Sequence, residues 1–147
     1  MSHASKIMIQ SQSETEDPKL ERKSTALAYL DAVAKQQFDR LETLLAPDLL
    51  FKGPALTRTT AADYIGALKR LGVIHSRSDL RRVFVDGDEA CLIYDFVTDT
   101  AAGAVPTIEW LHFEGDRIKA IDLFYDRQPW QTVAAVIVDR TARQQVA

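Results

Sequence analysis

The sequence predicts an α+β protein, with helices in the first half of the chain and antiparallel strands in the second. Up to Gly72, apolar residues recur with the period of a helix, and beyond it they alternate with polar residues as in strands. The strand-like segments are separated by short turn signals, Gly87-Asp88 and Gly115-Asp116, which join antiparallel neighbours. Helices followed by a run of strands are typical of the α+β class.

Length and composition fit one globular domain. The chain has 147 residues, of which 46% are hydrophobic and 27% charged, with a net charge of -3. Arg77, Arg81 and Arg82 are interleaved with acids, so no basic stripe indicates nucleic-acid binding. The longest apolar run, 133–138, is too short to span a bilayer, and we expect no membrane partner. The single cysteine, Cys91, excludes an intrachain disulfide; we therefore expect a cytoplasmic protein.

The N-terminal half divides into an arm and three helices. Residues 1–16 are polar and aperiodic, and we expect a flexible arm before a single domain over 17–130 and a C-terminal extension over 131–147. Asp17 and Pro18 are an N-cap and a first helical residue, so the first helix is predicted from there to about residue 36.

Two further helices follow. The segment 39–45 continues helical until Pro47 stops it. The segment 57–72 is predicted as the third helix, with Thr60 and Asp63 resembling a capping box and Gly72 as its end.

Strands are predicted for the remaining segments. A short strand or bend covers 49–54, and period-two strands cover 74–85, 89–98, 105–114 and 117–125. The tail after residue 130 fits either a helix or an additional strand. On strand 89–98, Tyr94, Phe96 and Thr98 share one face.

Glu109 raises the main functional question. In a strand it shares a face with Leu111 and Phe113, so this carboxyl is either at a wet edge or buried for a purpose. The answer depends on the hairpin register. A two-residue turn pairs Phe113 with Ile118 and puts Glu109 on the face of Ala120, Asp122 and Phe124. A three-residue loop pairs Phe113 with Arg117, and Glu109 then shares a face with Ile121, Leu123 and Tyr125.

Several segments of the sequence resemble the nuclear transport factor 2-like superfamily, which includes SnoaL-like proteins and ketosteroid isomerase. They are LLAPDLLFKGP, VFVDGDEACLIYDF and IEWLHFEGDRIKAIDLFYD. The resemblance covers about residues 20–130. It implies a cystatin-like α+β cone, in which a curved, mainly antiparallel sheet wraps around helices and encloses an apolar pocket. It also favours the register in which Glu109 points into the cone.

The resemblance implies roles for individual residues. Tyr29 falls where ketosteroid isomerase has its oxyanion-holding tyrosine, and Glu109 falls where it has a protonated acid. Gly53 falls where that enzyme has its aspartate base, so steroid isomerisation is not supported. His75 stands about where scytalone dehydratase has a histidine, while Asp31 and His112 match that enzyme poorly.

Two other enzyme patterns are also incomplete. The limonene epoxide hydrolase pattern requires an arginine where Thr107 stands. SnoaL-type cyclases use a late aspartate, for which Asp122 and Asp126 are the nearby acids. The candidate catalytic residues are therefore Glu109, Tyr29 and His75.

The pocket itself is expected to bind a small apolar molecule. The residues predicted to line it are Phe51, Tyr64, Tyr94, Phe96, Thr98, Leu111, Leu123 and Tyr125. No metal site is predicted, because the three histidines lack ligand spacing, and no cofactor motif is present. Trp110 and Phe124 fall on the opposite sheet face in the favoured register, which predicts a homodimer through that face.

The sequence thus favours a cofactor-free isomerase, dehydratase or cyclase acting on a small carbonyl or hydroxyl compound. Glu109 would be its acid or base because a carboxyl in a dry pocket has a raised pKa. The alternative is a non-catalytic ligand-binding or dimeric scaffolding protein, favoured by the missing base at Gly53.

Overall fold

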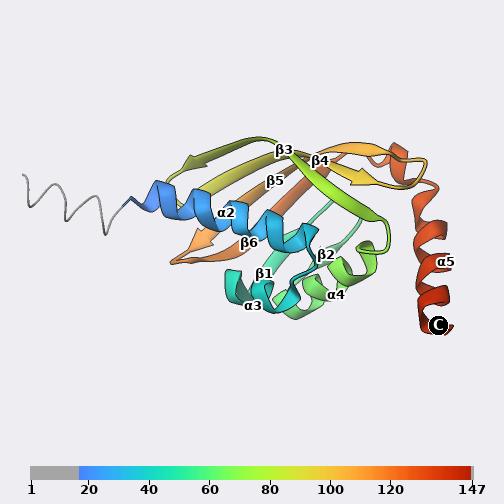
Figure 1. Ribbon diagram of the computed structural model, residues 1–147. Coiled ribbons are helices and arrows are strands. Elements are labelled where there is room, and N and C mark those ends of the chain that lie inside the picture. The colour runs from blue at the N-terminus through green and yellow to red at the C-terminus, as the bar shows by residue number, and fades with distance from the viewer. Residues whose placement is uncertain (1–16, 147) are drawn as a thin grey trace, which may run out of the picture.

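The computed structural model describes residues 17–146, and the predicted arm over 1–16 lies outside them. One six-stranded sheet, in the order β2-β1-β6-β5-β4-β3, curves over the helices α2, α3 and α4 (Figure 1). β1 pairs with β6 in parallel, and all other neighbours are antiparallel. The predicted α+β fold with a mainly antiparallel sheet is confirmed. The strands are β1 (Leu45–Lys52), β2 (Thr57–Arg58), β3 (His75–Asp86), β4 (Glu89–Thr98), β5 (Ala104–Glu114) and β6 (Arg117–Tyr125).

The helices α2 and α4 begin directly after the capping residues that were predicted from the sequence. α2 (Pro18–Ala34) follows Asp17, whose side chain accepts a hydrogen bond from the Leu20 backbone N–H at 3.3 Å. α3 (Phe38–Leu44) comes next. α4 (Ala61–Leu71) is capped by Thr60, whose hydroxyl accepts from the Asp63 N–H at 3.1 Å.

Two segments differ from the prediction. β1 begins at Leu45, so Pro47 lies inside a strand instead of ending a helix. The pairing of β1 with β6 is irregular between Leu45 and Leu50, and a proline without an N–H is tolerated at such a break in the ladder. Thr57 and Arg58 form β2 against the end of β1 instead of the first turn of α4.

Alternation along the central strands fixes the inner face of the sheet. Every second residue of β4 is buried, from Ala90 to Thr98, and every second residue of β5 is buried, from Val105 to Phe113. Glu109 lies within the buried row of β5 and is only 3% exposed. The carboxyl therefore faces the helices.

A β-bulge determines which side chains of β6 share the face of Glu109. The turn is the two-residue one, because Glu114 pairs with Arg117 and Phe113 with Ile118. His112 then pairs with Ala120, so Lys119 is an extra residue on β6. Beyond the bulge, Glu109 pairs with Leu123. From the sequence, a two-residue turn and an inward-facing Glu109 were alternatives. In the structure both occur, because the bulge shifts the register between them.

The tail after β6 folds back beside the sheet. After a short helix η1 (Gln128–Trp130), α5 (Val133–Val146) stands at one end of the molecule, and it is a helix, not an additional strand (Figure 1). Arg140 holds α5 in place, because its guanidinium donates to the Val73 carbonyl at 3.0 Å and to Asp99 at 2.6 Å. None of the described helices is long and apolar enough to cross a membrane.

The bulge yields the first testable prediction. Deletion of Lys119 would remove the extra residue from β6. The side chains on one half of that strand would then point to the opposite face of the sheet, and at least two buried side chains would become exposed. We expect the free energy of unfolding to fall by about 3–6 kcal/mol, a large part of a domain's stability. The control Lys119→Ala keeps the extra residue and should change stability by less than about 0.5 kcal/mol. Urea unfolding followed by circular dichroism measures both, and equal stability of the deletion variant and the parent would contradict the assignment of the bulge.

Candidate functional site

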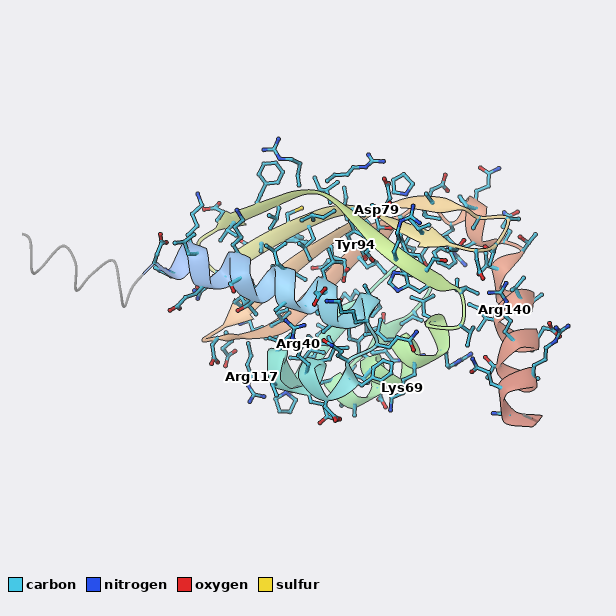
Figure 2. All side chains as sticks on the ribbon, viewed as in Figure 1. Arg40, Lys69, Asp79, Tyr94, Arg117 and Arg140 are labelled. Carbon is cyan, nitrogen blue, oxygen red and sulfur yellow. The ribbon has the colours of Figure 1, made fainter. Side chains whose placement is uncertain are left out.

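A cavity of about 810 Å³ lies between the inner sheet face, the helices α2 and α4 and the C-terminal segment. This volume is typical of a site for a small organic molecule. Side chains crowd the space under the sheet, and Tyr94 points into it from β4 (Figure 2). The lining is mostly apolar. Its polar members are Tyr29, Tyr64, Tyr94, Thr107, Glu109, Tyr125, Arg127, Trp130 and Gln131.

Four of these side chains form one hydrogen-bonded cluster at the buried end of the cavity. The Tyr29 hydroxyl lies 2.6 Å from Glu109 Oε1, and the Tyr94 hydroxyl lies 2.6 Å from Glu109 Oε2. The Tyr64 hydroxyl lies 2.5 Å from that of Tyr29. The four groups are buried, so the cluster is shielded from water.

Each member of the cluster comes from a different element. Tyr29 projects from α2, Tyr64 from α4, Tyr94 from β4 and Glu109 from β5. The ring of Tyr64 stacks on Phe51, with ring centroids 4.4 Å apart, and this contact fixes its position. The site therefore requires the sheet and both helices to be assembled.

Burial raises the pKa of Glu109 above its usual value, because the ionised form is removed from water. The hydrogen bonds from Tyr29 and Tyr94 oppose this shift, since they stabilise the carboxylate. Burial has the larger effect, so Glu109 keeps its proton to a higher pH than an exposed glutamate does.

The three tyrosines remain protonated. Burial raises the pKa of Tyr29, Tyr64 and Tyr94 well above the usual value, and the nearby charge of Glu109 raises it further. Their hydroxyls are thus hydrogen-bond donors and acceptors throughout the neutral range.

Counting protons shows what the cluster presents to a ligand. Three hydrogen bonds join its members, and the tyrosines supply three protons. With Glu109 ionised, all three protons lie inside the cluster, which then only accepts hydrogen bonds from the cavity. With Glu109 protonated there are four protons for three bonds, so one hydroxyl of Tyr64 or Tyr94 is free to donate to a ligand. Protonation of one carboxyl thus switches the cluster from acceptor to donor.

Most of the residues predicted for the pocket line the cavity, and two do not. Phe51, Tyr64, Tyr94, Phe96, Leu123 and Tyr125 line it. Leu111 is in the core of the sheet, fully buried. Thr98 lies at the end of β4, where its hydroxyl donates to the Gly103 carbonyl at 2.9 Å and closes a turn. Alternation gave the correct face for both, but the cavity covers only the middle of that face.

Of the three candidate catalytic residues, two line the cavity and one does not. Tyr29 and Glu109 are in contact. His75 is outside the cavity, where its ring stacks on Phe96 at 4.0 Å and bonds to the Ser78 hydroxyl at 2.9 Å. Burial lowers the pKa of His75, which favours the neutral imidazole of a packing residue.

The other acids and histidines considered from the sequence also point elsewhere. Asp31 forms ion pairs with Lys35 and Arg40 on the surface. His112 and Asp122 pair with each other at 3.1 Å on the outer sheet face. Asp126 accepts from the Gln128 N–H at 3.0 Å and begins η1.

Gly53 lines the cavity without contributing a functional group. A Cβ at this position would lie 3.3 Å from the Phe51 ring and 3.4 Å from Leu123, so a side chain there would require a small shift of the Phe51 ring. Among residues 17–146, Glu109 is the one carboxyl that lines the cavity.

Sequence reasoning missed the contribution of the C-terminal segment. The cavity is lined from η1, α5 and the residues that flank η1 by Arg127, Trp130, Gln131, Val133, Ala134 and Ile137. Helical spacing of apolar residues after Pro129 was the available signal, but it could not indicate where the helix packs.

No group of His, Cys, Asp and Glu side chains arranged to hold a metal ion occurs in the described part of the chain. A sequence profile described as the SnoaL-like domain matches residues 26–121, more than half of the chain. None of the curated proteins matches in sequence.

Many solved structures share the fold. A protein from Kribbella flavida DSM 17836 is 27% identical, with a TM-score of 0.69 over 83% of this chain and 95% of that one. A candidate SnoaL-like polyketide cyclase from Jannaschia sp. CCS1 is 14% identical, with a TM-score of 0.68 over 80% and 93%. A hypothetical protein with a ketosteroid isomerase-like fold from Catenulispora acidiphila DSM 44928, in complex with trimethylamine, is 21% identical, with a TM-score of 0.60 over 69% and 85%.

Proposed function

Since this chain belongs to the SnoaL-like domain family, we propose that it binds a small, largely apolar carbonyl or hydroxyl compound and catalyses proton transfer on it without a cofactor. The observation that carries this proposal is the buried cluster of Glu109 with three tyrosines at the inner end of the cavity. The reaction class is an isomerisation, dehydration or cyclisation, in which a proton moves at or next to a carbon–oxygen bond.

The chemistry of the cavity supports this assignment. Apolar walls exclude water from the ligand, and the cluster provides the hydrogen-bonding groups that would hold its oxygen. A carboxyl with a raised pKa is matched to proton transfer near neutrality. Tyr64 or Tyr94 would relay the proton between Glu109 and the ligand.

One observation favours the alternative, a non-catalytic ligand-binding protein. Gly53 supplies no base, and Glu109 alone among the described residues brings a carboxyl to the cavity. A mechanism that needs separate acid and base groups is therefore not supported. Glu109 would have to take a proton and return it, as in an isomerisation at a carbon next to a carbonyl.

The proton count gives a pH prediction. Because the pKa of Glu109 is raised, the spare donor is present at low pH and is lost as pH rises through that value. We expect the affinity for a ketone, which only accepts, to fall with rising pH, whereas the alcohol of the same skeleton can donate to the ionised cluster and should not weaken. Calorimetry with 2-decalone and 2-decalol measures both. In Glu109→Gln the ketone affinity should become independent of pH, since the amide does not titrate.

Matched phenylalanine variants locate the contact. Tyr94→Phe should weaken ketone binding by about five- to tenfold, the value of one hydrogen bond. Tyr125→Phe makes the same change at a residue that lines the cavity outside the cluster, and it should have a smaller effect. An equal effect of the two variants, or a pH-independent ketone affinity in the parent, would contradict the proposal.

Catalysis is tested with the same ketone in deuterium oxide. An enzyme would exchange the hydrogens on the carbon next to the carbonyl for deuterium from the solvent, and Glu109→Gln should abolish this exchange. Binding without exchange, for this ketone and for steroid, terpenoid and polyketide fragments, would favour the non-catalytic alternative.

We also propose that the chain forms a homodimer through the outer sheet face. The exposed side chains of Phe84 on β3, Ile108 and Trp110 on β5 and Phe124 on β6 lie on the outer sheet face, and we call them the outer patch. Strand pairing puts Phe124 next to Ile108, and Cys91 of β4 lies between Phe84 and Trp110. They are 49%, 38%, 41% and 52% exposed. No described helix covers this face (Figure 1), and apolar side chains grouped in this way are typical of interfaces.

Light scattering after size exclusion tests the dimer. The parent chain, of 16.5 kDa, should elute with twice that mass at micromolar concentration. Trp110→Glu combined with Phe124→Glu should give a folded monomer, because charges at the centre of the patch would be buried in the dimer. Leu20→Glu, at a side chain that is 62% exposed on α2, is the control and should leave the dimer intact. A monomeric parent would overturn the proposal.

A further inference from the structure

The two ends of the cavity differ in charge. Glu109 lies at the buried end, whereas Arg127 lines the cavity and is itself exposed, so it stands at the mouth. Arg127 is the one lysine or arginine that lines the cavity, and it forms no ion pair with any residue in 17–146. Its guanidinium is therefore available to a ligand.

The mouth carries further donors beside Arg127. The amide of Gln131 lines the same region, and the indole N–H of Trp130 is buried with no acceptor among the described residues. The indole packs between Phe96 and Tyr125, with ring centroids 5.6 and 5.5 Å away. An unmet buried donor is unfavourable, and an acceptor that arrived with a small shift of the indole would relieve it. The mouth thus offers hydrogen-bond donors to a ligand that carries acceptors.

The positive charge acts on the cavity wall. Burial raises the pKa of Tyr125, and the charge of Arg127 opposes that shift. Tyr125 also lines the cavity, so the charge of Arg127 acts on a group in the cavity wall next to the mouth. A ligand anion at the mouth would experience the same attraction.

The buried end would reject an anion. A carboxylate there would lose its hydration and lie beside Glu109, whose own charge is already disfavoured by burial. A molecule with an anionic group and a neutral oxygen function would therefore enter in one orientation only.

From this polarity we infer that the ligand is an apolar carboxylic acid, whose carboxylate binds Arg127 at the mouth while its carbonyl or hydroxyl oxygen contacts the tyrosine–glutamate cluster. This inference rests on the proposed function and narrows its substrate class. The segment that supplies Arg127, Trp130 and Gln131 lies after residue 121, where the match to the family ends.

The fold also sets the length of the ligand. Glu109 pairs with Leu123, and Arg127 follows four residues later. A strand rises about 3.3 Å per residue, but β6 ends at Tyr125 and the backbone of Arg127 is helical, so the Cα atoms of Leu123 and Arg127 lie less than about 13 Å apart. A phenol joined to a carboxylate by a chain of several carbons spans this distance.

The probes are 4-hydroxyphenylalkanoates with chains of two to eight carbons, each compared with its methyl ester by calorimetry. We expect the acids to bind on the order of tenfold more tightly than their esters, with an optimum at intermediate chain length, and to lose this preference at high salt. Arg127→Gln should bring the ratio of acid to ester affinity close to one, because the charge that favours the acid is removed. Arg127→Lys should restore part of the preference.

The control variant is Arg143→Gln, which removes the same charge from α5 at a side chain that is 79% exposed. It should leave the acid preference intact. If acid and ester bind equally in the parent, or if Arg143→Gln has the same effect as Arg127→Gln, the inference is overturned while the proposed binding of oxygen compounds stands. Tighter binding of the corresponding 4-hydroxyphenylalkylamines than of the acids would also overturn it. If neither acids nor esters bind, the inference is overturned, and the proposed function fails with it only if 2-decalone and 2-decalol also do not bind.

Discussion

A single carboxyl group under three tyrosine hydroxyls is the constraint on which the rest of the structure depends. Glu109 lies in an otherwise apolar row of β5, and its burial is tolerated because both its oxygens are hydrogen-bonded and because the proton is retained more strongly than usual. Those hydrogen bonds join α2 and α4 to the sheet. The same contacts therefore hold the helices in place and form the polar end of an apolar cavity.

Backbone geometry makes this arrangement possible. The extra residue Lys119 in β6 lets Ile118 near the turn and Ile121 farther along the hairpin both face inward, on the same side as Glu109. At the other end, the C-terminal segment closes one side of the cavity, and Arg140 fastens α5 to Asp99 and to the Val73 carbonyl. The cavity thus has a carboxyl with a raised pKa at its inner end and an arginine at its mouth.

The sequence predicted those features that depend on local pattern. Helix caps at Asp17 and Thr60, the change of period after Gly72 and the alternation of β4 specify the fold and the inner face. The same reasoning placed Tyr29 and Glu109 together only through family resemblance, because their contact spans 80 residues. It did not find the bulge, which has no local signature at Lys119, or the role of Arg127 and Trp130. It also assigned His75 to the candidate site, although packing on Phe96 takes that ring away from the cavity.

The central claim is that Glu109 keeps its proton beyond the range of an ordinary glutamate. Carbon-detected NMR of the side-chain carboxyl, assigned by comparison with Glu109→Gln and followed as pH is raised, measures this directly. The structure predicts a midpoint clearly above about 4.3, the usual value for glutamate, and a further rise in Tyr94→Phe, which lacks one hydrogen bond that stabilises the carboxylate. A midpoint at or below about 4.3 would contradict the account, since the cluster would then only accept hydrogen bonds at neutral pH.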